Sequence, residues 1–261
     1  MGEPEQNGTE IEDRMDPARA AALAAALGFD WQPDDPLPPF FHQAYFWQPR
    51  PEAELGRDGH SARGGLIPDL GLPRRMWAGG RLLFHAPLRP GLPARRATRV
   101  EGATRKTGRS GPLAFVTLRH DITQRGMVCV SEWQDLVFRA DPDPAAPTPE
   151  PPRAPDGAQA ESRARFSTTT LFRYSALTFN GHRIHYDLDY CREVEGYPGL
   201  VVHGPLLAQI LMLMAPGPLR SFRFRATAPL FHFEEARFCR AGKRLWVAGP
   251  DGRLCMEAEA G

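Results

Sequence analysis

The stretch FNGHRIHYD at residues 179–187 concentrates side chains that can handle protons. His182 and His185 stand three residues apart, Asn180 comes just ahead of them, and a Tyr-Asp pair follows. A neutral imidazole can take a proton from water near pH 7, because its unperturbed pKa lies close to that pH. An amide such as Asn180 cannot act as a base, but it can hold a water molecule by donating one hydrogen bond and accepting another. The stretch is therefore a candidate acid/base site.

Two other interpretations of the same stretch are open. The first is a metal site, but zinc needs three or four ligands, and no cysteine or third histidine stands at a useful spacing from His182 and His185. Arg183 lies between the two histidines and would repel a cation. The second is a solvated loop without chemical function. We expect no metal here.

A second element, LVVHGPLLAQ at residues 200–209, could stabilise a negative charge. An apolar run ends at His203-Gly204, and an apolar helix begins there. The first N–H groups of a helix have no partner within it, the helix dipole favours negative charge at that end, and glycine permits close approach. Gly204 N–H is thus a candidate donor to an oxygen on which charge develops. A base next to such a donor is what addition of water across an α,β-unsaturated thioester requires. The alternative is that HGP merely starts a helix.

The elements that must position these residues are mostly strands. We predict strands in the first part of the chain at roughly 81–86, 97–106, 113–123 and 127–138, and in the last part at 222–230, 233–239, 244–248 and 253–259. Two further segments, PFFHQAYFW at 39–47 and TTTLFRYSALTF at 168–179, are also interpreted as strands.

Two helices are predicted. One lies in DPARAAALAAALGFD, with Asp16 as N-cap, Pro17 at the first position and Gly28 just past the end. The other runs over about 205–215 and is apolar nearly all round, so it should be wholly buried. A lone buried helix with an antiparallel sheet curled around it is a hot-dog arrangement. The predicted fold class is α+β, a double hot dog whose N-terminal half is degenerate because it lacks a clear counterpart of this helix.

The domain organisation follows from composition. Residues 141–162 are rich in Pro, Ala and acidic residues and contain no bulky apolar residue, so they predict an extended linker. We predict a disordered tail at 1–15, an N-terminal half at 16–140, the linker at 141–162, and a catalytic half at 163–261.

Bulk properties exclude some partners. The net charge is +1, which argues against a nucleic-acid partner. The longest apolar run, at 206–215, is shorter than the roughly 20 residues that a bilayer span needs. The start is acidic and polar, unlike a signal peptide. The four cysteines are far apart and are interpreted as free thiols. We expect a cytoplasmic protein.

The quoted motifs resemble those of the MaoC-like, hydratase-2-type family of enoyl-thioester hydratases and dehydratases, in its double-hot-dog branch. The resemblance rests on FNGHRIHYD, on GYPGLVVHGPLLAQ and on the Met-Trp-Ala-Gly-Gly stretch at 76–80, and it covers most of residues 16–261. It implies an enzyme, a hydro-lyase that adds water to an α,β-unsaturated acyl-CoA or removes it. The expected substrate is a branched dicarboxylyl-CoA such as mesaconyl-C4-CoA or itaconyl-CoA.

The resemblance also implies site residues. The wider family has an Asp–His dyad five residues apart; here Asn180 stands at the Asp position and His185 is kept. It implies His185 as base, Asn180 as the water-orienting group and Gly204 as backbone oxyanion donor. Residues implied in substrate binding are Arg183, His182, Tyr186, His203 and Trp77. Arg183 could bind a substrate carboxylate or form a loop salt bridge with Asp187 or Asp189.

No cofactor is expected apart from the coenzyme A of the substrate. Candidates for binding its phosphates are arginines of the N-terminal half: Arg95, Arg96, Arg99, Arg105 and Arg109. His85 could be a second base, but is interpreted as a sheet histidine. The aromatic residues of 40–47 could line the acyl pocket or form core. Rival functions are a dehydratase of carrier-protein-bound chains, a hot-dog thioesterase and a non-catalytic acyl-thioester-binding protein. The chain could be a monomer or pair as a homodimer.

Overall fold

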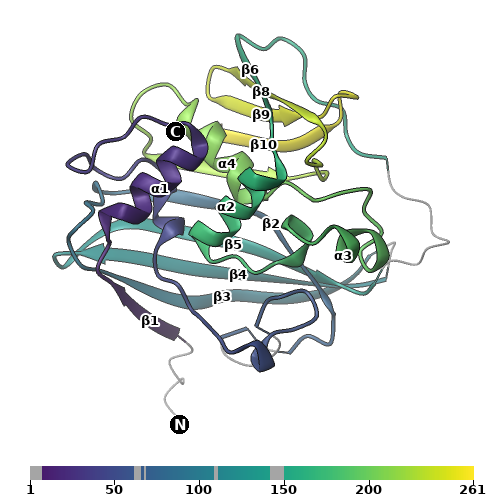
Figure 1. The fold of residues 1–261 in the computed structure, drawn as a ribbon, viewed down its shortest axis with the longest axis horizontal. Coiled ribbons are helices and arrows are strands. Elements are labelled where there is room, and N and C mark those ends of the chain that lie inside the picture. The colour runs from purple at the N-terminus through teal and green to yellow at the C-terminus, as the bar shows by residue number, and fades with distance from the viewer. Residues whose placement is uncertain (1–7, 62–65, 68, 109–110, 142–149) are drawn as a thin grey trace.

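The computed structural model describes residues 8–61, 66–67, 69–108, 111–141 and 150–261. One ten-stranded sheet, in the order β1-β3-β4-β5-β2-β7-β10-β9-β8-β6, runs through the molecule (Figure 1). All neighbouring strands are antiparallel. The strands are β1 Gly8–Asp13, β2 Arg74–Phe84, β3 Ala94–Gly108, β4 Gly111–Gln124, β5 Met127–Arg139, β6 Ala160–Arg165, β7 Ser221–Ala226, β8 Glu235–Ala241, β9 Arg244–Ala248 and β10 Leu254–Ala260.

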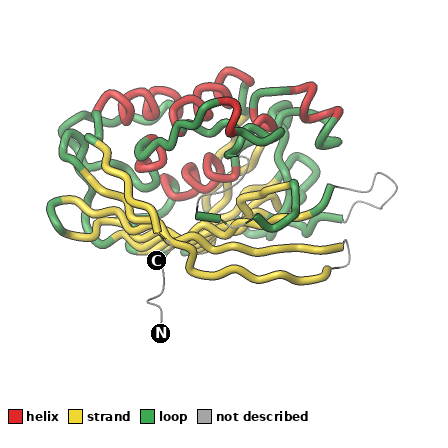
Figure 2. The backbone as a smooth tube through the Cα atoms, turned by 90° about the horizontal axis from the view of Figure 1, so that it is seen from below, coloured by secondary structure: helices red, strands yellow, loops and turns green. Residues whose placement is uncertain are grey.

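The sheet has two halves that meet where β2 pairs with β7. The register there runs from Gly79 opposite Arg225 to Leu83 opposite Ser221. Strands β1 to β5 lie on one side of this joint and β6 to β10 on the other. The helices cover one face of the sheet and leave the other open (Figure 2). They are α1 Pro17–Leu27, α2 Thr168–Thr178, α3 Leu188–Glu193 and α4 Gly204–Leu213, with short 3-10 turns η1 Phe41–Ala44, η2 Glu52–Glu54 and η3 Arg183–His185.

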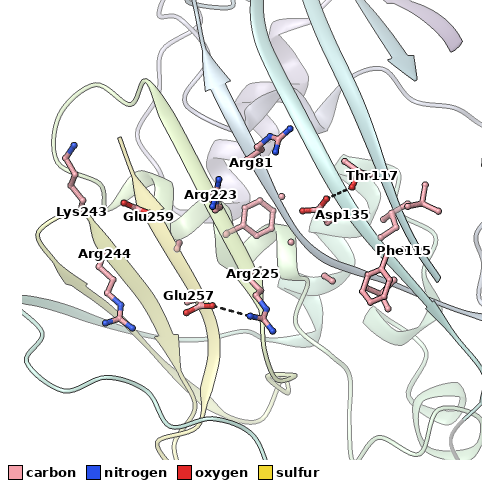
Figure 3. A pocket seen from close by; sticks show the side chains of 18 of the residues that line it. Arg81, Phe115, Thr117, Asp135, Arg223, Arg225, Lys243, Arg244, Glu257 and Glu259 are labelled. Carbon is pink, nitrogen blue, oxygen red and sulfur yellow. Dashed lines mark hydrogen bonds and ion pairs between the residues drawn. The ribbon is translucent and has the colours of Figure 1, made fainter. Parts of the chain in front are cut away.

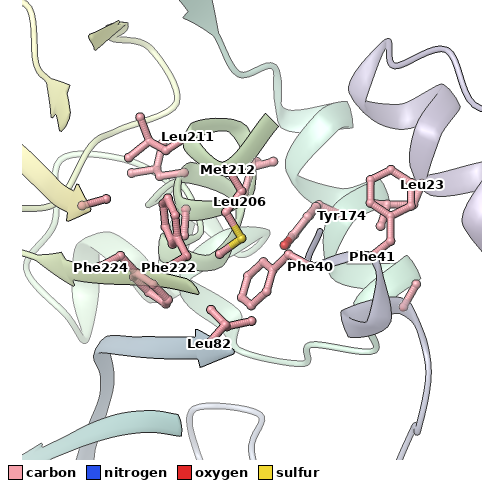
Figure 4. Packing of buried hydrophobic residues seen from close by; sticks show 14 of the residues in the cluster. Leu23, Phe40, Phe41, Leu82, Tyr174, Leu206, Leu211, Met212, Phe222 and Phe224 are labelled. Carbon is pink, nitrogen blue, oxygen red and sulfur yellow. The ribbon is translucent and has the colours of Figure 1, made fainter. Parts of the chain in front are cut away.

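Helix α4 is the buried helix that the sequence predicts. It packs on β10, β2, β7 and β9, so it lies over the joint between the halves. Leu206, Leu211 and Met212 are almost completely buried among apolar residues of both halves (Figure 4). Burial of each such side chain contributes about 1.5–3 kcal/mol. The energy of this packing holds the N-terminus of α4 in place beside the joint.

Residues 168–178 form helix α2 and Phe179 is its C-cap, so the strand predicted at 168–179 is wrong. Ser167 is the N-cap, and its hydroxyl accepts a hydrogen bond from Thr170 N–H at 3.1 Å. Leu171, Tyr174 and Ser175 are buried, at the three- and four-residue spacing of a helix face. The β-branched threonines favour a strand locally, but the cap and the packing against α1 outweigh this preference.

Residues 39–47 do not form the predicted strand either. Phe40 and Phe46 have φ of 71° and 59°, a left-handed backbone that interrupts a strand, and the 3-10 turn η1 lies between them. Phe40, Phe41, Tyr45 and Phe46 are core residues, each at most 2% exposed. Their segment contacts β5 through a hydrogen bond between His42 and Glu132 at 2.8 Å. This short turn lies against the N-terminal half of the sheet. The sequence analysis predicted that this half has no clear counterpart of the buried helix.

The chain ends and the linker differ in part from expectation. Residues 8–13 form β1 on the edge of β3, so this part of the predicted tail is ordered. Residues 160–162 belong to β6, which pairs with β8, although they were assigned to the linker. Residues 1–7 and 142–149 lie outside the described residues. The N-cap of α1 is Asp16, with Gly28 in a left-handed conformation at its end, as predicted. All four cysteines are free and buried. Within the described part of the chain, no helix is long and apolar enough to cross a membrane.

Candidate functional site

The motif at 179–187 forms a tight loop between α2 and α3. Asn180 Oδ1 accepts a hydrogen bond from His182 N–H at 3.0 Å, so this amide oxygen closes a turn. Tyr186 Oη donates to Gly181 O at 2.7 Å and braces the same turn. Asp187 caps α3 by accepting from Tyr190 N–H at 2.9 Å. Asn180 keeps its NH₂ group and the second lone pair of Oδ1 to hold a water molecule, so its predicted orienting role stays a prediction.

His185 is held in one tautomer. Its Nδ1 lies 2.8 Å from Val201 O, and a carbonyl can only accept, so Nδ1 carries the proton. The other ring nitrogen, Nε2, is then an unprotonated acceptor. His185 is buried, and this burial holds its pKa well below the ordinary value, with the charge of His182 acting in the same direction. The ring is neutral and has the nitrogen free that a general base needs.

His203 lies directly against His185. Their rings stack with centroids 3.6 Å apart, and Ser175 Oγ is hydrogen-bonded to His203 Nε2 at 2.8 Å. His203 is completely buried, so it supports the ring of His185 and does not face an open surface. Val201 N–H also donates to Ile184 O at 2.9 Å, which ties the segment before α4 to the motif loop.

The N-terminus of α4 lies next to this stack. Gly204 follows His203 as the first residue of the helix, and no acceptor of its N–H is found among the described residues. A Cβ built on Gly204 would be 3.9 Å from Trp77 O. Trp77 donates through Nε1 to Gly79 O at 2.9 Å and packs against Phe224. The fold thus brings together His185, His203, Gly204 and Trp77, from both sides of the joint.

Arg183 is occupied by partners of its own. Its guanidinium forms an ion pair with Asp187 at 2.7 Å and lies over the ring of Tyr190. It also donates through Nη1 to Arg57 O at 3.1 Å. Of the two sequence-based interpretations, the loop salt bridge with Asp187 is the one that the structure contains. The second role of Arg183 is to tie the motif to the loop of residues 56–60.

That loop holds two candidate site residues, Asp58 and His60, that sequence reasoning missed. Asp58-Gly59-His60 forms the same turn as Asn180-Gly181-His182: Asp58 Oδ1 accepts from His60 N–H at 3.0 Å. Asp58 Oδ2 also lies 3.1 Å from His60 Nδ1. The recurrence of Asx-Gly-His in the two halves is the sequence signal that could have revealed them.

The two turns pack against each other through their glycines. A Cβ on Gly59, whose φ is +85°, would lie 2.0 Å from Gly181 O, and one on Gly181 would lie 2.7 Å from Gly59 O. Arg183 N–H donates to Asp58 O at 2.9 Å across the same contact. Only glycine permits this approach, so the two Asx-Gly-His turns form one interlocked junction.

We expect Gly59→Ala to disrupt the junction. The added methyl collides with Gly181 O, and the left-handed backbone adds roughly 1–2 kcal/mol of strain. A displacement of about 1 Å at a site can cost roughly 10²-fold in rate. Steady-state kinetics should show this loss. The matched control is Gly71→Ala, because Gly71 has a φ of +64° but nothing within 4 Å of a built Cβ. Equal activity of the two variants would contradict a role of the junction.

The junction places a row of imidazoles side by side. The ring centroids of His60 and His182 are 4.6 Å apart, and those of His182 and His185 are 5.4 Å apart. Burial, with the charge of His60, lowers the pKa of His182 to about 3. Burial raises the pKa of Asp58, but the hydrogen bonds that it accepts from His60 Nδ1 and His60 N–H outweigh this effect and hold that pKa well below its ordinary value. Asp58 is therefore an ionised carboxylate beside neutral rings.

Asp58, His60 and His182 also have the spacing of a metal site, which the sequence did not predict. One ligand-type atom from each lies within 4.8 Å of the others. However, the carboxylate of Asp58 already bonds His60, and the charge of the partly buried Arg75 acts on both Asp58 and His60. A second cation next to Arg75 would be repelled, so the arrangement favours proton handling over metal binding.

Arg75 is a partly buried cation without a counter-ion in contact among the described residues. No hydrogen bond or ion pair of its guanidinium is found among the described residues, whereas the neighbouring Arg74 forms a buried ion pair with Glu195. Arg75 lines a small cavity of about 20 Å³ together with Asp58 and His182. This volume is about that of one water molecule, and the walls combine charged residues with the apolar Met76 and Ile184. The guanidinium of Arg75 is therefore free of a direct ion pair, next to the carboxylate of Asp58.

A much larger hollow than this cavity lies elsewhere on the described part of the chain. It is a groove of about 1020 Å³ on the open face of the sheet, lined by residues of β2, β4, β5, β7 and β10 and of the β8–β9 turn, among them Arg81, Arg225 and Glu257 (Figure 3). None of His182, His185 and Gly204 lines it. Size alone would thus select the wrong face, and the buried histidine row is the better candidate site.

The other sequence candidates lie apart from the row. His85 Nε2 is hydrogen-bonded to Ser131 Oγ at 3.2 Å, as expected for a sheet histidine. Arg95 and Arg99 on β3 pair with Glu10 and Asp121, at 3.0 and 3.2 Å. Arg96 donates to Phe46 O at 3.1 Å, Arg105 is exposed, and Arg109 lies outside the described residues. Strands β4 and β5 separate β3 from the joint, so contact of these arginines with coenzyme A stays a prediction.

Comparison with known proteins places the chain among acyl-thioester enzymes. It is 46% identical, over 265 residues, to mesaconyl-C(4)-CoA hydratase of Chloroflexus aurantiacus, covering 95% of this chain and 93% of that protein. It resembles the structure of a MaoC-like dehydratase from Phytophthora capsici, with a TM-score of 0.71 and 12% identity, covering 98% and 96% of the two chains.

A Mycobacterium tuberculosis protein described as a double hot dog matches with a TM-score of 0.59 at 16% identity, over 97% of this chain and 94% of that one. The predicted double-hot-dog fold is thus confirmed. The signature of hydroxyacyl-thioester dehydratase type 2 matches residues 40–232, which span both turns of the junction and the N-terminus of α4. The chain therefore belongs to the hydroxyacyl-thioester dehydratase type 2 family.

Proposed function

We propose that this hydro-lyase hydrates mesaconyl-C4-CoA, or a closely related branched dicarboxylyl-CoA, at the junction of its two halves. The observation that carries the proposal is the pairing of His185, whose Nε2 is free, with the unpaired N–H of Gly204 at the start of α4. The 46% identity to a mesaconyl-C(4)-CoA hydratase supports the substrate class. No cofactor is proposed beyond the coenzyme A of the substrate.

The reaction follows from these two groups. His185 Nε2 takes a proton from water as the water oxygen bonds to the β-carbon. The electrons of the double bond move to the thioester oxygen, where Gly204 N–H and the positive end of α4 stabilise the developing charge. The proton then passes from His185 to the α-carbon on the same face, which restores the carbonyl and gives a 3-hydroxyacyl thioester. Asn180 orients the water, and the stacked His203 orients the ring of His185.

Arg75 supports a substrate with a free carboxylate. In mesaconyl-C4-CoA this carboxylate is carried by the carbon that water attacks, so it must lie close to the bases. Arg75 lines the cavity shared by Asp58 and His182 and has no ion pair among the described residues. Arg183, the residue first expected to bind the carboxylate, is paired with Asp187. We therefore assign the carboxylate to Arg75 in this proposal.

We expect Arg75→Met to lower kcat/KM for mesaconyl-C4-CoA by roughly 10–10²-fold, since a charge-assisted hydrogen bond is worth about 1.5–3 kcal/mol. Crotonyl-CoA, which has no carboxylate, should be affected much less. Arg81→Met on the open face of β2 is the control. Equal losses with both substrates would argue against carboxylate recognition by Arg75.

The proposal is tested with a panel of crotonyl-, mesaconyl- and itaconyl-CoA, following loss of the conjugated double bond together with release of free thiol. Hydration removes the double bond without releasing thiol, whereas a thioesterase releases thiol. Gln209 is the only polar residue within α4 between Pro205 and Leu213, and it is an amide that cannot act as the carboxylate base expected of a thioesterase. Both halves of the site come from one chain, so a homodimer, one of the two states left open by the sequence, is not needed to complete it.

A further inference from the structure

The site lacks a carboxylate at the position where the dyad was expected. Asn180 cannot take a proton or carry a negative charge. His185 is buried and its pKa is lowered, so a proton on its ring is costly unless a negative charge lies near. The motif loop contains one acid, Asp187, but its carboxylate is committed to Arg183 and the cap of α3.

The structure assigns this missing carboxylate to Asp58, which the N-terminal half supplies together with His60 as the carboxylate–imidazole pair of the active site. The assignment rests on the hydration reaction proposed above. Asp58 and Asn180 occupy equivalent positions in two interlocked turns, and both accept the N–H of the second following residue at 3.0 Å. The chain thus keeps the acid of the dyad, but in the other half.

The contacts of the pair fit this role. Asp58 Oδ2 accepts from His60 Nδ1, at 3.1 Å, so the ring of His60 is oriented and its Nε2 is free. The ring of His60 contacts that of His182, which in turn lies against His185. When His185 holds the proton taken from water, the ionised Asp58 offsets this positive charge through the row of rings. The proton returns to the α-carbon, so no net charge is created. Asp58 and His60 are positioning residues, because they act through His182 and His185.

Several charged or titratable groups face the pair and set its protonation. Burial and the cation of Arg75 lower the pKa of His60, and Asp58 raises it. His182 faces the ring from the motif loop, and Tyr186 and Tyr190 lie within the field of Asp58. Among these groups, the Asp58 carboxylate is the one that favours protonation of the His60 ring. When Asp58 is neutralised, the acidic limb of the pH profile of kcat/KM should therefore move to lower pH.

Asp58→Asn is the sharpest variant, because it makes the first turn Asn-Gly-His, a sequence that already forms this turn at 180–182. The fold should therefore survive. We expect kcat to fall by roughly 10² while KM changes little. Glu54→Gln, an exposed acid in the same segment, is the control and should be unchanged. His60→Asn, which keeps a donor for Asp58 but cannot be protonated, should also lower kcat.

The decisive variant moves the carboxylate from one turn to the other. Asp58→Asn combined with Asn180→Asp should regain at least tenfold of the lost kcat, because an acid in either turn faces the same row of rings. A purely structural role of Asp58 predicts no such rescue. The assignment would be overturned if Asp58→Asn kept activity within about twofold of the parent. It would also be overturned if the double variant failed to restore the lost kcat and the acidic limb of the pH profile did not move.

Two further measurements separate this assignment from other failures. Proton NMR titration of the ring protons of His60 and His182 should show lower pKa values in Asp58→Asn, and this readout does not depend on turnover. If the parent enzyme turns over no ester of the panel while the titration shows the shift, the proposed function fails and the electrostatic link stands. Activity lost to a chelator and restored by zinc would overturn the assignment, because Asp58, His60 and His182 would then serve a metal.

Discussion

Replacement of His185 by alanine is expected to lower kcat by roughly 10³, within the range that general-base catalysis contributes. No other ring in the row combines a free Nε2 with a carbonyl that fixes its tautomer in the way that Val201 O does. Water alone would have to lose its proton to solvent as the C–O bond forms, which is far slower. Steady-state rates with mesaconyl-C4-CoA provide the measurement.

The alanine variant also removes a buried ring that stacks on His203 and leaves Val201 O without its donor, at a cost of about 1–3 kcal/mol. His185→Asn separates these effects, because its NH₂ can still donate to Val201 O while it cannot accept a proton. Both variants should be inactive, but only His185→Ala should lose much thermal stability. His85→Ala is the control histidine and should keep full activity. Substantial turnover by His185→Asn would remove His185 from the mechanism.

Replacement of Gly204 by proline is expected to cost roughly 10²–10³ in kcat, because it deletes the N–H that stabilises the thioester oxygen. Proline suits the position otherwise: it is tolerated in the first turn of a helix, and His203 has a ψ of 127°, which is compatible with a following proline. The variant removes this donor, but position 204 is followed by Pro205, which disfavours a helical conformation at the residue before it, so a thermal melt must accompany the rates.

Gly204→Ala is the matched control, since a methyl there meets only Trp77 O at 3.9 Å and Met256 Cε at 4.0 Å. It keeps the N–H and should retain most of the activity. Equal rates of the proline and alanine variants would show that the donor is not used, and that the thioester oxygen lies elsewhere.

Much of the fold could be predicted from local pattern. Asp16, Pro17 and Gly28 marked α1 because capping depends on residues near in sequence, and the apolar run after Gly204 marked α4 as buried. The segments that failed depend on tertiary contacts. The threonines of α2 favour a strand, but Leu171 and Tyr174 pack on a helix face. The left-handed Phe40 and Phe46 are imposed by the core around them.

The sequence predicted about half of the candidate site. His185, His203 and Gly204 lie in two neighbouring motifs, so one stretch of sequence suggested them. Asp58 and His60 precede His182 by more than a hundred residues, and the contact of Gly59 with Gly181 and the hydrogen bonds of Arg183 bring them together. Arg75 offered no signal, because an arginine in a strand is usually a surface residue. Its burial next to an acid and two histidines is a property of the folded chain.

The central claim is that the junction adds water to the β-carbon of an enoyl thioester. Incubation of the purified chain with mesaconyl-C4-CoA in H₂¹⁸O, followed by mass spectrometry of the products, tests it directly. The account predicts an intact coenzyme A ester that carries one ¹⁸O at the new hydroxyl, and no such product with His185→Asn. Label found in a free dicarboxylic acid with coenzyme A released, or a substrate that stays unlabelled and unsaturated, would contradict it.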